Sequence, residues 1–474
     1  MFGFKFIGNT RIPHRKNTAE SQSVRIAPPA EVLLPTQQHI GAPASPIVKV
    51  GDTVKVGQKV AEAVGFVSSP IYSTVSGKVT KIDTYMGPLG KECPAIRIES
   101  DGLMTKDEGI APPVVESLDQ LVAAVKESGL VGLGGAGFPT SVKLEALKSG
   151  KIDTIVVNAA ECEPYLTADT RAMEEDTDDL IEGVRLFRKY APEVRIIFGI
   201  EANKAHSIAL LSEKFADMDC VSIVTLPTLY PQGGEKVIIY NTTRRIVPEG
   251  KLPADVGVVV LNVSSLAFIA SYVRTGMPLV EKRVTVDGSA IKEPKNLIVP
   301  IGTPISVLAE AAGGFTEDLG KVLYGGPMMG MPVCSVDEPI IKTTNGIIAL
   351  NERDADVPTA TPCIHCGRCV EACPFGLNPT VFSKALSVEP TEERVIRLEE
   401  AKINLCMECG CCSFVCPAKR PLIQNNRLAK AEVRSYRSHQ AGLKNGAGAP
   451  PPPAKDASAT SPKSDAEKKG EEAK

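Results

Sequence analysis

The stretch CIHCGRCVEACP (residues 363–374) decides the fold of the C-terminal part of this chain. Its pattern recurs in CMECGCCSFVCP (residues 406–417). Both copies read Cys-x2-Cys-x2-Cys-x3-Cys-Pro, and they hold eight of the thirteen cysteines in the chain. The repeat therefore predicts one small domain that carries two equivalent metal-binding loops.

This spacing is typical of bacterial ferredoxin sequences that bind a pair of [4Fe–4S] clusters, where the fourth Cys of each run ligates the other cluster. Zinc is the alternative, because paired C-x2-C motifs can hold it, but zinc does not explain two identical runs that end in Pro. Cys411 breaks the spacing and is not a predicted ligand. We assign Cys363, Cys366, Cys369 and Cys416 to one cluster, and Cys406, Cys409, Cys412 and Cys373 to the other.

Composition limits the remaining possibilities. The 474 residues have room for about three or four domains. The chain is 43% hydrophobic with a net charge of −3, and it has no Trp, so nucleic-acid binding is not expected. The sequence predicts neither a signal peptide nor a membrane-spanning segment, since it starts without a long apolar run and has no apolar stretch of bilayer length. The many cysteines fit a reducing compartment, which places the chain on the cytoplasmic side.

The N-terminal domain, residues 1–110, is predicted to be mostly β. Between residues 47 and 98, valines alternate with polar residues, and Gly51-Asp52 and Ser76-Gly77 supply turns. This pattern resembles the biotinyl/lipoyl hammerhead. Those domains carry a modified Lys at a hairpin tip, whereas residues 64–69 (VGFVSS) contain no Lys. A structural role is therefore favoured over a swinging arm.

Residues 115–275 are predicted to form an α/β domain with a parallel sheet. Short apolar runs at 152–157, 194–200 and 221–226 are typical of buried strands. Helical periodicity appears at 118–127, 178–189 and 203–215. The expected fold class is thus multidomain α/β plus β.

Three further segments follow. Residues 280–350 contain short β runs and a brief helix at 306–312, which favour a small β-grasp module. Residues 355–430 form the two-cluster domain, expanded by helices that begin near Asn378 and Thr391. Residues 440–474 are rich in Gly, Ala, Pro, Ser, Lys and Glu, so this tail is predicted to be disordered.

The loop GLGGAG (residues 132–137) is the first candidate ligand site. It fits G-x-G-x-x-G, but no clear strand precedes it, so a Rossmann site is not expected. Its glycines expose backbone N–H groups, and the helix predicted to start at Pro139-Thr140 favours a phosphate. Lys143 adds positive charge one turn into that helix. The alternative is a Gly-rich turn without a ligand.

The loop NAAECEP (residues 158–164) directly follows the predicted strand at 152–157. The carboxyl ends of parallel strands are where α/β proteins bind ligands. Asn158, Glu161 and Glu163 can hold ribityl, ribose or amide groups. A solvated acidic loop remains the alternative.

Together these segments resemble the NADH-binding flavoprotein subunit of respiratory complex I. The matching text is GFPT with Lys143, the NAAECEP loop, YPQGGE (residues 230–235) and NVSSL (residues 262–266). Ala160 and Gly234 replace two acidic residues of that family. The resemblance implies that NADH lies near Phe138, Glu163 and Glu235. It implies that FMN contacts Gly132, Gly134, Gly135, Gly137, Lys143, Asn158, Glu161 and Glu163, with Asn262 and Ser265 nearby.

Over residues 1–430 the chain is more similar to the C subunit of the Rnf ferredoxin–NAD oxidoreductase complex. The segment QHIGAPA (residues 38–44) and the order of the domains carry this resemblance. It implies a peripheral subunit of a membrane-bound, ion-translocating complex, at the cytoplasmic face of the cell membrane, with other subunits as partners. Electrons would pass between NAD(H), FMN and two [4Fe–4S] clusters, and reach ferredoxin indirectly.

Two other functions remain open from the sequence. One is a related cobalamin reductase that shares the flavin and cluster domains. The other is a cluster-only electron relay whose nucleotide domain is vestigial. FMN belongs between NADH and the clusters in the Rnf-type function, because a hydride carries two electrons and a cluster accepts one.

Overall fold

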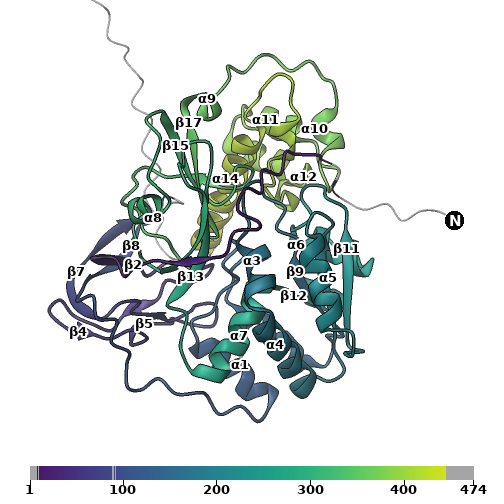
Figure 1. The fold of residues 1–474 in the computed structure, drawn as a ribbon. Helices are drawn as coiled ribbons and strands as arrows, with labels where there is room; N and C mark the ends of the chain where they lie inside the picture. The colour runs from purple at the N-terminus through teal and green to yellow at the C-terminus, as the bar shows by residue number, and fades with distance from the viewer. Residues whose placement is uncertain (1–7, 9, 88–89, 91, 445–474) are drawn as a thin grey trace, which may run out of the picture.

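The computed structural model describes residues 8, 10–87, 90 and 92–444. Figure 1 shows the N-terminal β domain and the α/β domain side by side in the lower part of the view. The cysteine-rich helices, coloured yellow-green, lie in the upper part of Figure 1. Within those residues, no helix combines the length and the apolar character needed to cross a bilayer.

The N-terminal domain contains two small sheets, and short strands are present between residues 47 and 98, where the alternating valines predicted them. One sheet has the order β2-β8-β7-β4 and the other β3-β5-β6. Their buried faces share one core that includes Val32, Val60, Val79 and Ile98. The hairpin tip at residues 64–67 lies outside every strand. The strands are β2 (Glu31–Pro35), β3 (Ser45–Pro46), β4 (Thr53–Val54), β5 (Lys59–Glu62), β6 (Ile71–Tyr72), β7 (Gly77–Met86) and β8 (Glu92–Ser100).

The α/β domain has a four-stranded parallel sheet in the order β11-β10-β9-β12. The strands are β9 (Thr154–Ala159), β10 (Arg195–Glu201), β11 (Val221–Leu226) and β12 (Val258–Asn262). Three of them match the predicted apolar runs, although β9 begins two residues later than predicted. The chain adds β10 and β11 on one side of β9 and β12 on the other, so the topological switch point lies between β9 and β12.

Helices cover this sheet (Figure 1). The helix predicted after the Gly-rich loop is present but spans only six residues. Helix α3 was missed by the sequence, because its polar residues show little apolar periodicity. The helices are α1 (Leu118–Glu127), α2 (Thr140–Glu145), α3 (Ala168–Glu175), α4 (Thr177–Tyr190), α5 (Ala205–Lys214), α6 (Glu235–Thr243) and α7 (Val263–Thr275).

The third module is a six-stranded mixed sheet in the order β1-β14-β13-β17-β15-β16. Its edge strand β1 (Val24–Arg25) comes from the N-terminal segment and pairs in parallel with β14. The sequence did not predict this contribution. The other elements are β13 (Glu281–Asp287), β14 (Lys295–Pro300), α8 (Ile305–Ala311), β15 (Leu319–Tyr324), β16 (Met331–Pro332), β17 (Gly346–Asn351) and α9 (Glu352–Ala355).

The cysteine-rich domain is helical. Asn378 caps α11 by accepting a hydrogen bond from the Thr380 N–H at 3.2 Å, as its position predicted. Helix α14 runs to Lys444, so residues 440–444 of the predicted disordered tail are helical, and residues 445–474 lie outside the described residues. The helices are α10 (Arg368–Glu371), α11 (Pro379–Ala385), α12 (Thr391–Glu400), α13 (Cys411–Phe414) and α14 (Leu422–Lys444).

The N-terminal segment crosses between these domains (Figure 1, purple). The backbones of Thr10 and Tyr230 form an antiparallel bridge. The Asn17 amide donates to Asp287 at 3.1 Å. The first residues of the described chain are therefore hydrogen-bonded to both the α/β domain and the mixed sheet.

Candidate functional site

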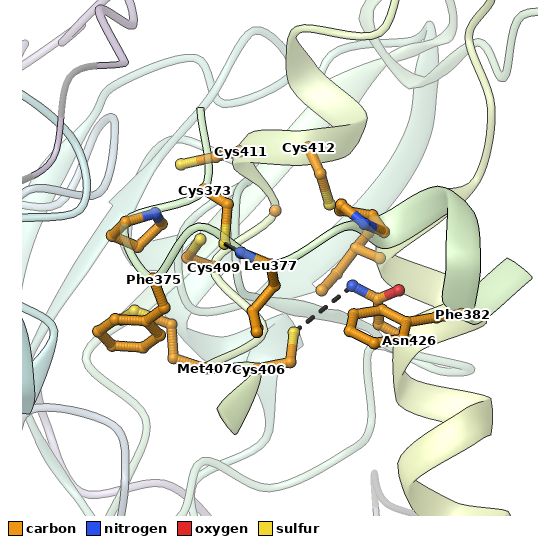
Figure 2. A pocket seen from close by; sticks show the side chains of 14 residues that line it. Cys373, Phe375, Leu377, Phe382, Cys406, Met407, Cys409, Cys411, Cys412 and Asn426 are labelled. Atoms are coloured by element: carbon orange, nitrogen blue, oxygen red, sulfur yellow. Dashed lines mark hydrogen bonds between the residues drawn. The ribbon is translucent and has the colours of Figure 1, made fainter. Parts of the chain in front are cut away.

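Four cysteines of the second predicted set line one cavity in the helical domain (Figure 2). They are Cys406, Cys409 and Cys412 from the second run, and Cys373 from the first. The Leu377 N–H donates to the Cys373 sulfur, and the Asn426 amide donates to the Cys406 sulfur, each at 3.4 Å. Cys411 also lines this cavity, and all five thiols lie among apolar side chains such as Phe382.

The first predicted set lines a second cavity, where Cys416 joins the three leading cysteines of the first run. Cys366 is exposed, so this cavity lies nearer the surface. The two runs share a backbone conformation. Gly367 and Gly410 have φ angles of +77° and +79°, and each lies two residues past a left-handed His365 or Glu408. The fourth cysteine of each run thus lies in the cavity of the other run, which is the crossed arrangement predicted from the spacing.

The donor set fits the implied clusters. Each cavity is lined by the four thiols of one predicted set, with Cys411 as a fifth in the first cavity, and four thiolates are what a [4Fe–4S] cluster takes from a protein. N–H groups that point at sulfur favour the thiolate form, because they stabilise negative charge there. A bound cluster would supply one-electron transfer at each cavity.

The Gly-rich loop forms a turn whose tip is open. Gly134 and Gly135 are exposed, and Gly135 has a φ angle of +108°, with no heavy atom within 4 Å of the place that a Cβ would occupy. Gly137 is buried, and a Cβ there would lie 2.5 Å from Cγ2 of Thr343. The Leu133 N–H donates to the Ser265 hydroxyl at 3.1 Å. The structure thus joins the predicted loop to the predicted Ser265.

Two predicted asparagines lie side by side at the switch point. Asn158 of β9 and Asn262 of β12 are register partners at the carboxyl ends of their strands. The Asn158 amide donates to the Gly233 carbonyl at 2.9 Å. A Cβ on Gly134 would lie 3.0 Å from the Asn262 amide nitrogen, so the loop lies directly on Asn262. This edge is where an open α/β sheet binds its ligand.

The two predicted glutamates of the 158–164 loop point into the protein. The Glu161 carboxylate accepts from the backbone N–H groups of Asp169 (2.6 Å) and Thr170 (3.1 Å), at the start of α3. The Glu163 carboxylate accepts from the Tyr230 hydroxyl at 3.1 Å. Two backbone N–H groups of the 328–329 loop donate to it as well. Burial raises the pKa of Glu163.

Lys143 and Glu235 form an ion pair at 3.0 Å. The Lys143 ammonium also donates to the Val260 carbonyl at 3.2 Å. Phe138 is partly buried just before α2, and its carbonyl accepts from the Gly132 N–H at 2.9 Å. The structure thus gathers most predicted flavin and NADH residues around one edge of the sheet.

Two charged residues at this edge carried no sequence signal. The Asp169 carboxylate accepts from the Asn262 amide at 2.7 Å, and burial raises its pKa to about 6. Lys282 donates to the Leu133 carbonyl at 2.9 Å, and burial lowers its pKa to about 8. Asp169 is in a helix that the sequence missed, and Lys282 is in another module, so no motif spacing could reveal them.

The sheet edge contacts the cysteine domain directly. The single proton of the Tyr230 hydroxyl is shared between two acceptors, the Cys409 carbonyl at 2.8 Å and the Glu163 carboxylate at 3.1 Å. A Cβ on Gly234 would lie 2.2 Å from Cε of Met407. One pair of bonded side chains therefore connects the 158–164 loop to the Cys409 loop.

The family models match four segments in order. They are an RnfC barrel sandwich hybrid domain (residues 4–103), a Nuo51 FMN-binding domain (125–271), an SLBB domain (283–332) and a 4Fe-4S dicluster domain (359–420). The FMN-binding match contains the Gly-rich loop and both asparagines. The dicluster match contains both cysteine runs.

Full-length relatives decide the family. The chain is 42% identical to the C subunit of the proton-translocating ferredoxin:NAD(+) oxidoreductase complex of Clostridium ljungdahlii, over 91% of this chain and 94% of the relative. It is 41% identical to the Na(+)-translocating counterpart of Acetobacterium woodii, over 91% and 98%. The chain belongs to this C-subunit family. The C subunit of an ion-translocating oxidoreductase complex from Rhodobacter capsulatus is 37% identical, over 90% of this chain and 83% of the relative.

Membership of the C-subunit family confirms the resemblance drawn from residues 38–44 and from the domain order. The expected fold class and the expected FMN and iron–sulfur cofactors are confirmed as well.

Proposed function

We propose that this chain passes electrons between NAD(H), FMN and two [4Fe–4S] clusters, as a subunit of an ion-translocating ferredoxin:NAD oxidoreductase complex. The observation that carries the proposal is the contact between the two sites. The Tyr230 hydroxyl bonds both to Glu163, in the flavin-domain loop, and to the carbonyl of the cluster ligand Cys409. When bound, FMN exchanges electron pairs with NAD(H) and single electrons with clusters.

The chain's own residues would hold FMN at the switch point. The exposed backbone of Gly134 and Gly135 can approach a phosphate closely, because these residues lack side chains. Asn158 and Asn262 border the same edge, and Lys143 adds a positive charge. Glu161 and Glu163 accept hydrogen bonds from the protein, so they would shape the loop while its backbone meets the flavin.

We assign the eight predicted cysteines as cluster ligands in the crossed sets given above. The Cys409 loop contacts the flavin domain through the Tyr230 hydroxyl and through Met407 against Gly234, whereas Cys366 in the other cavity is exposed. An exposed cluster can exchange electrons with another subunit. The five segments 1–110, 115–275, 280–350, 355–430 and 440–474 remain our proposed division of the chain.

The location follows from the proposed complex. As a peripheral subunit at the cytoplasmic face of the cell membrane, the chain would contact membrane-bound partner subunits. Its basic C-terminal helix contributes less free charge than its sequence implies, because Lys430 and Arg437 pair with Glu408 and Glu399. We expect the chain to sediment with membranes only when the partners are present. Sedimentation of the isolated chain with neutral, protein-free liposomes would contradict this.

Anaerobic reconstitution tests the function. The full chain should bind FMN and about eight iron and eight sulfide, the content of two four-iron clusters. NADH should then bleach the flavin absorbance and reduce the clusters. A chain that holds clusters but no flavin would instead support the cluster-only relay. The cobalamin reductase alternative is disfavoured, because the relatives named above belong to oxidoreductase complexes and match over nearly their whole length.

A further inference from the structure

Two lysines bind the carbonyl groups of the loop that follows β9. Lys16, from the N-terminal segment, donates to the carbonyls of Glu161 (2.7 Å), Glu163 (2.9 Å) and Leu166 (2.5 Å). The buried Lys204, which follows β10, donates to the Ala160 carbonyl at 2.6 Å. Four carbonyls in a stretch of seven residues thus point toward two ammonium groups.

The two lysines differ in how their charge is balanced. Lys204 pairs with the buried Glu201 at 3.3 Å. All three hydrogen bonds of Lys16 end on backbone carbonyl oxygens. The dipoles of these carbonyl groups stabilise the ammonium charge, whereas Lys204 is bonded to a carboxylate. Burial, and then Lys204, lower the pKa of Lys16 to about 8, while Glu161, Glu201 and Cys162 act in the opposite direction. Near neutral pH this lysine is therefore mostly protonated.

This charge lies behind the proposed flavin site. The carbonyls that Lys16 binds begin three residues after Asn158, which borders the switch point. A partly buried charge is screened less than an exposed one, so its field extends across the loop. Hydride transfer from NADH gives NAD⁺ and adds two electrons and one proton to the flavin, so the flavin gains one negative charge while the nicotinamide gains one positive charge. A nearby positive charge stabilises the reduced flavin.

We propose that Lys16 is a positioning residue of the flavin site that fixes the 161–166 loop and raises the midpoint potential of the bound flavin. The inference rests on the proposed function, since it places FMN beside this loop. It goes further by giving the N-terminal segment, which lies outside the matched FMN-binding domain, a part in setting the driving force of the NADH reaction.

The test uses the full chain, reconstituted with FMN and clusters, and three variants. Lys16→Met removes the charge, and Lys16→Arg keeps it. Lys214→Met removes an equal charge from an exposed position of α5 and is the matched control. The readouts are the flavin midpoint potential from anaerobic dye titration, the dissociation constant for FMN, and the iron content.

We expect the flavin potential of Lys16→Met to shift to more negative values, while Lys16→Arg and Lys214→Met stay near the wild type. Iron content should be unchanged in all three. An unshifted potential in FMN-bound Lys16→Met, or an equal shift in Lys214→Met, would overturn the proposal. If the Met variant does not fold, Lys16→Gln replaces it under the same criterion. Wild-type protein that binds no FMN would instead refute the proposed function itself.

Discussion

Replacing Gly137 with alanine should weaken FMN binding for two separable reasons. Gly137 has a φ angle of +67°, and an alanine held there costs about 1–2 kcal/mol relative to glycine. The new Cβ would also lie 2.5 Å from Cγ2 of Thr343, a contact far inside van der Waals distance. Thr343 is β-branched and has few rotamers with which to give way. The loop must therefore move, and overpacking of this kind costs about 1–3 kcal/mol.

Only the clash with Thr343 should lower the affinity for FMN, because it displaces the loop that would hold the flavin. About 1–3 kcal/mol corresponds to a rise in the dissociation constant of FMN of about 5- to 150-fold. Gly150→Ala is the matched control. Gly150 also has a φ angle of +67°, but a Cβ there meets nothing within 4 Å. It should lose stability through the backbone alone and bind FMN as the wild type does.

Thr343→Ser provides a second, sharper check. Serine lacks the Cγ2 methyl group, so the double variant Gly137→Ala/Thr343→Ser removes the clash and keeps the backbone cost. Its affinity for FMN, measured by quenching of flavin fluorescence, should return most of the way to the wild-type value. Normal FMN affinity in Gly137→Ala alone, or no recovery in the double variant, would refute the placement of the flavin on this loop.

Three further predictions concern other parts of the chain. Cys412→Ser should reduce the reconstituted iron from about eight to about four per chain, whereas Cys411→Ser should keep about eight; equal losses would contradict the ligand assignment. The family resemblance places Glu235 near NADH, so Glu235→Gln should slow flavin reduction by NADH but not by dithionite. The fold should persist, because the partly exposed ion pair of Glu235 with Lys143 contributes under about 1 kcal/mol. Burial lowers the pKa of Lys342 from 10.5 to about 7, so the unfolded chain binds more protons above pH 7. Wild-type stability should then rise between pH 7 and 9 by about 2 kcal/mol more than that of Lys342→Met, as judged by the free energy of unfolding from denaturant titrations.

Periodic and spaced patterns were the features that the sequence predicted well. The runs at 194–200 and 221–226 became β10 and β11, because a buried parallel strand must be apolar along its whole length. The structure brings the eight cysteines together in the two groups that their spacing predicted, and their role as cluster ligands stays a prediction. Helix α3 was missed, since it is mostly polar and packs mainly through small residues such as Ala172.

The sequence could not predict the long-range polar contacts. Lys16 bonds to carbonyls about 145 residues away, and a single lysine in a loop has no periodicity that could indicate its partner. The sequence likewise did not predict that the Glu163 carboxylate points toward the 328–329 loop. The family resemblance predicted the residue, but its direction depends on the mixed-sheet module that supplies the two N–H donors.

These contacts explain why the flavin-domain loop does not stand alone in this chain. Its carbonyls are bonded by Lys16 from the N-terminal segment, and its Glu163 side chain is bonded by the mixed-sheet module and by Tyr230. Tyr230 in turn bonds to the backbone of the Cys409 loop. A loop held from three directions can move little, so the separation between flavin and cluster is set by the assembly of the modules. Displacing any one module should therefore alter electron transfer to the cluster even when both cofactors remain bound.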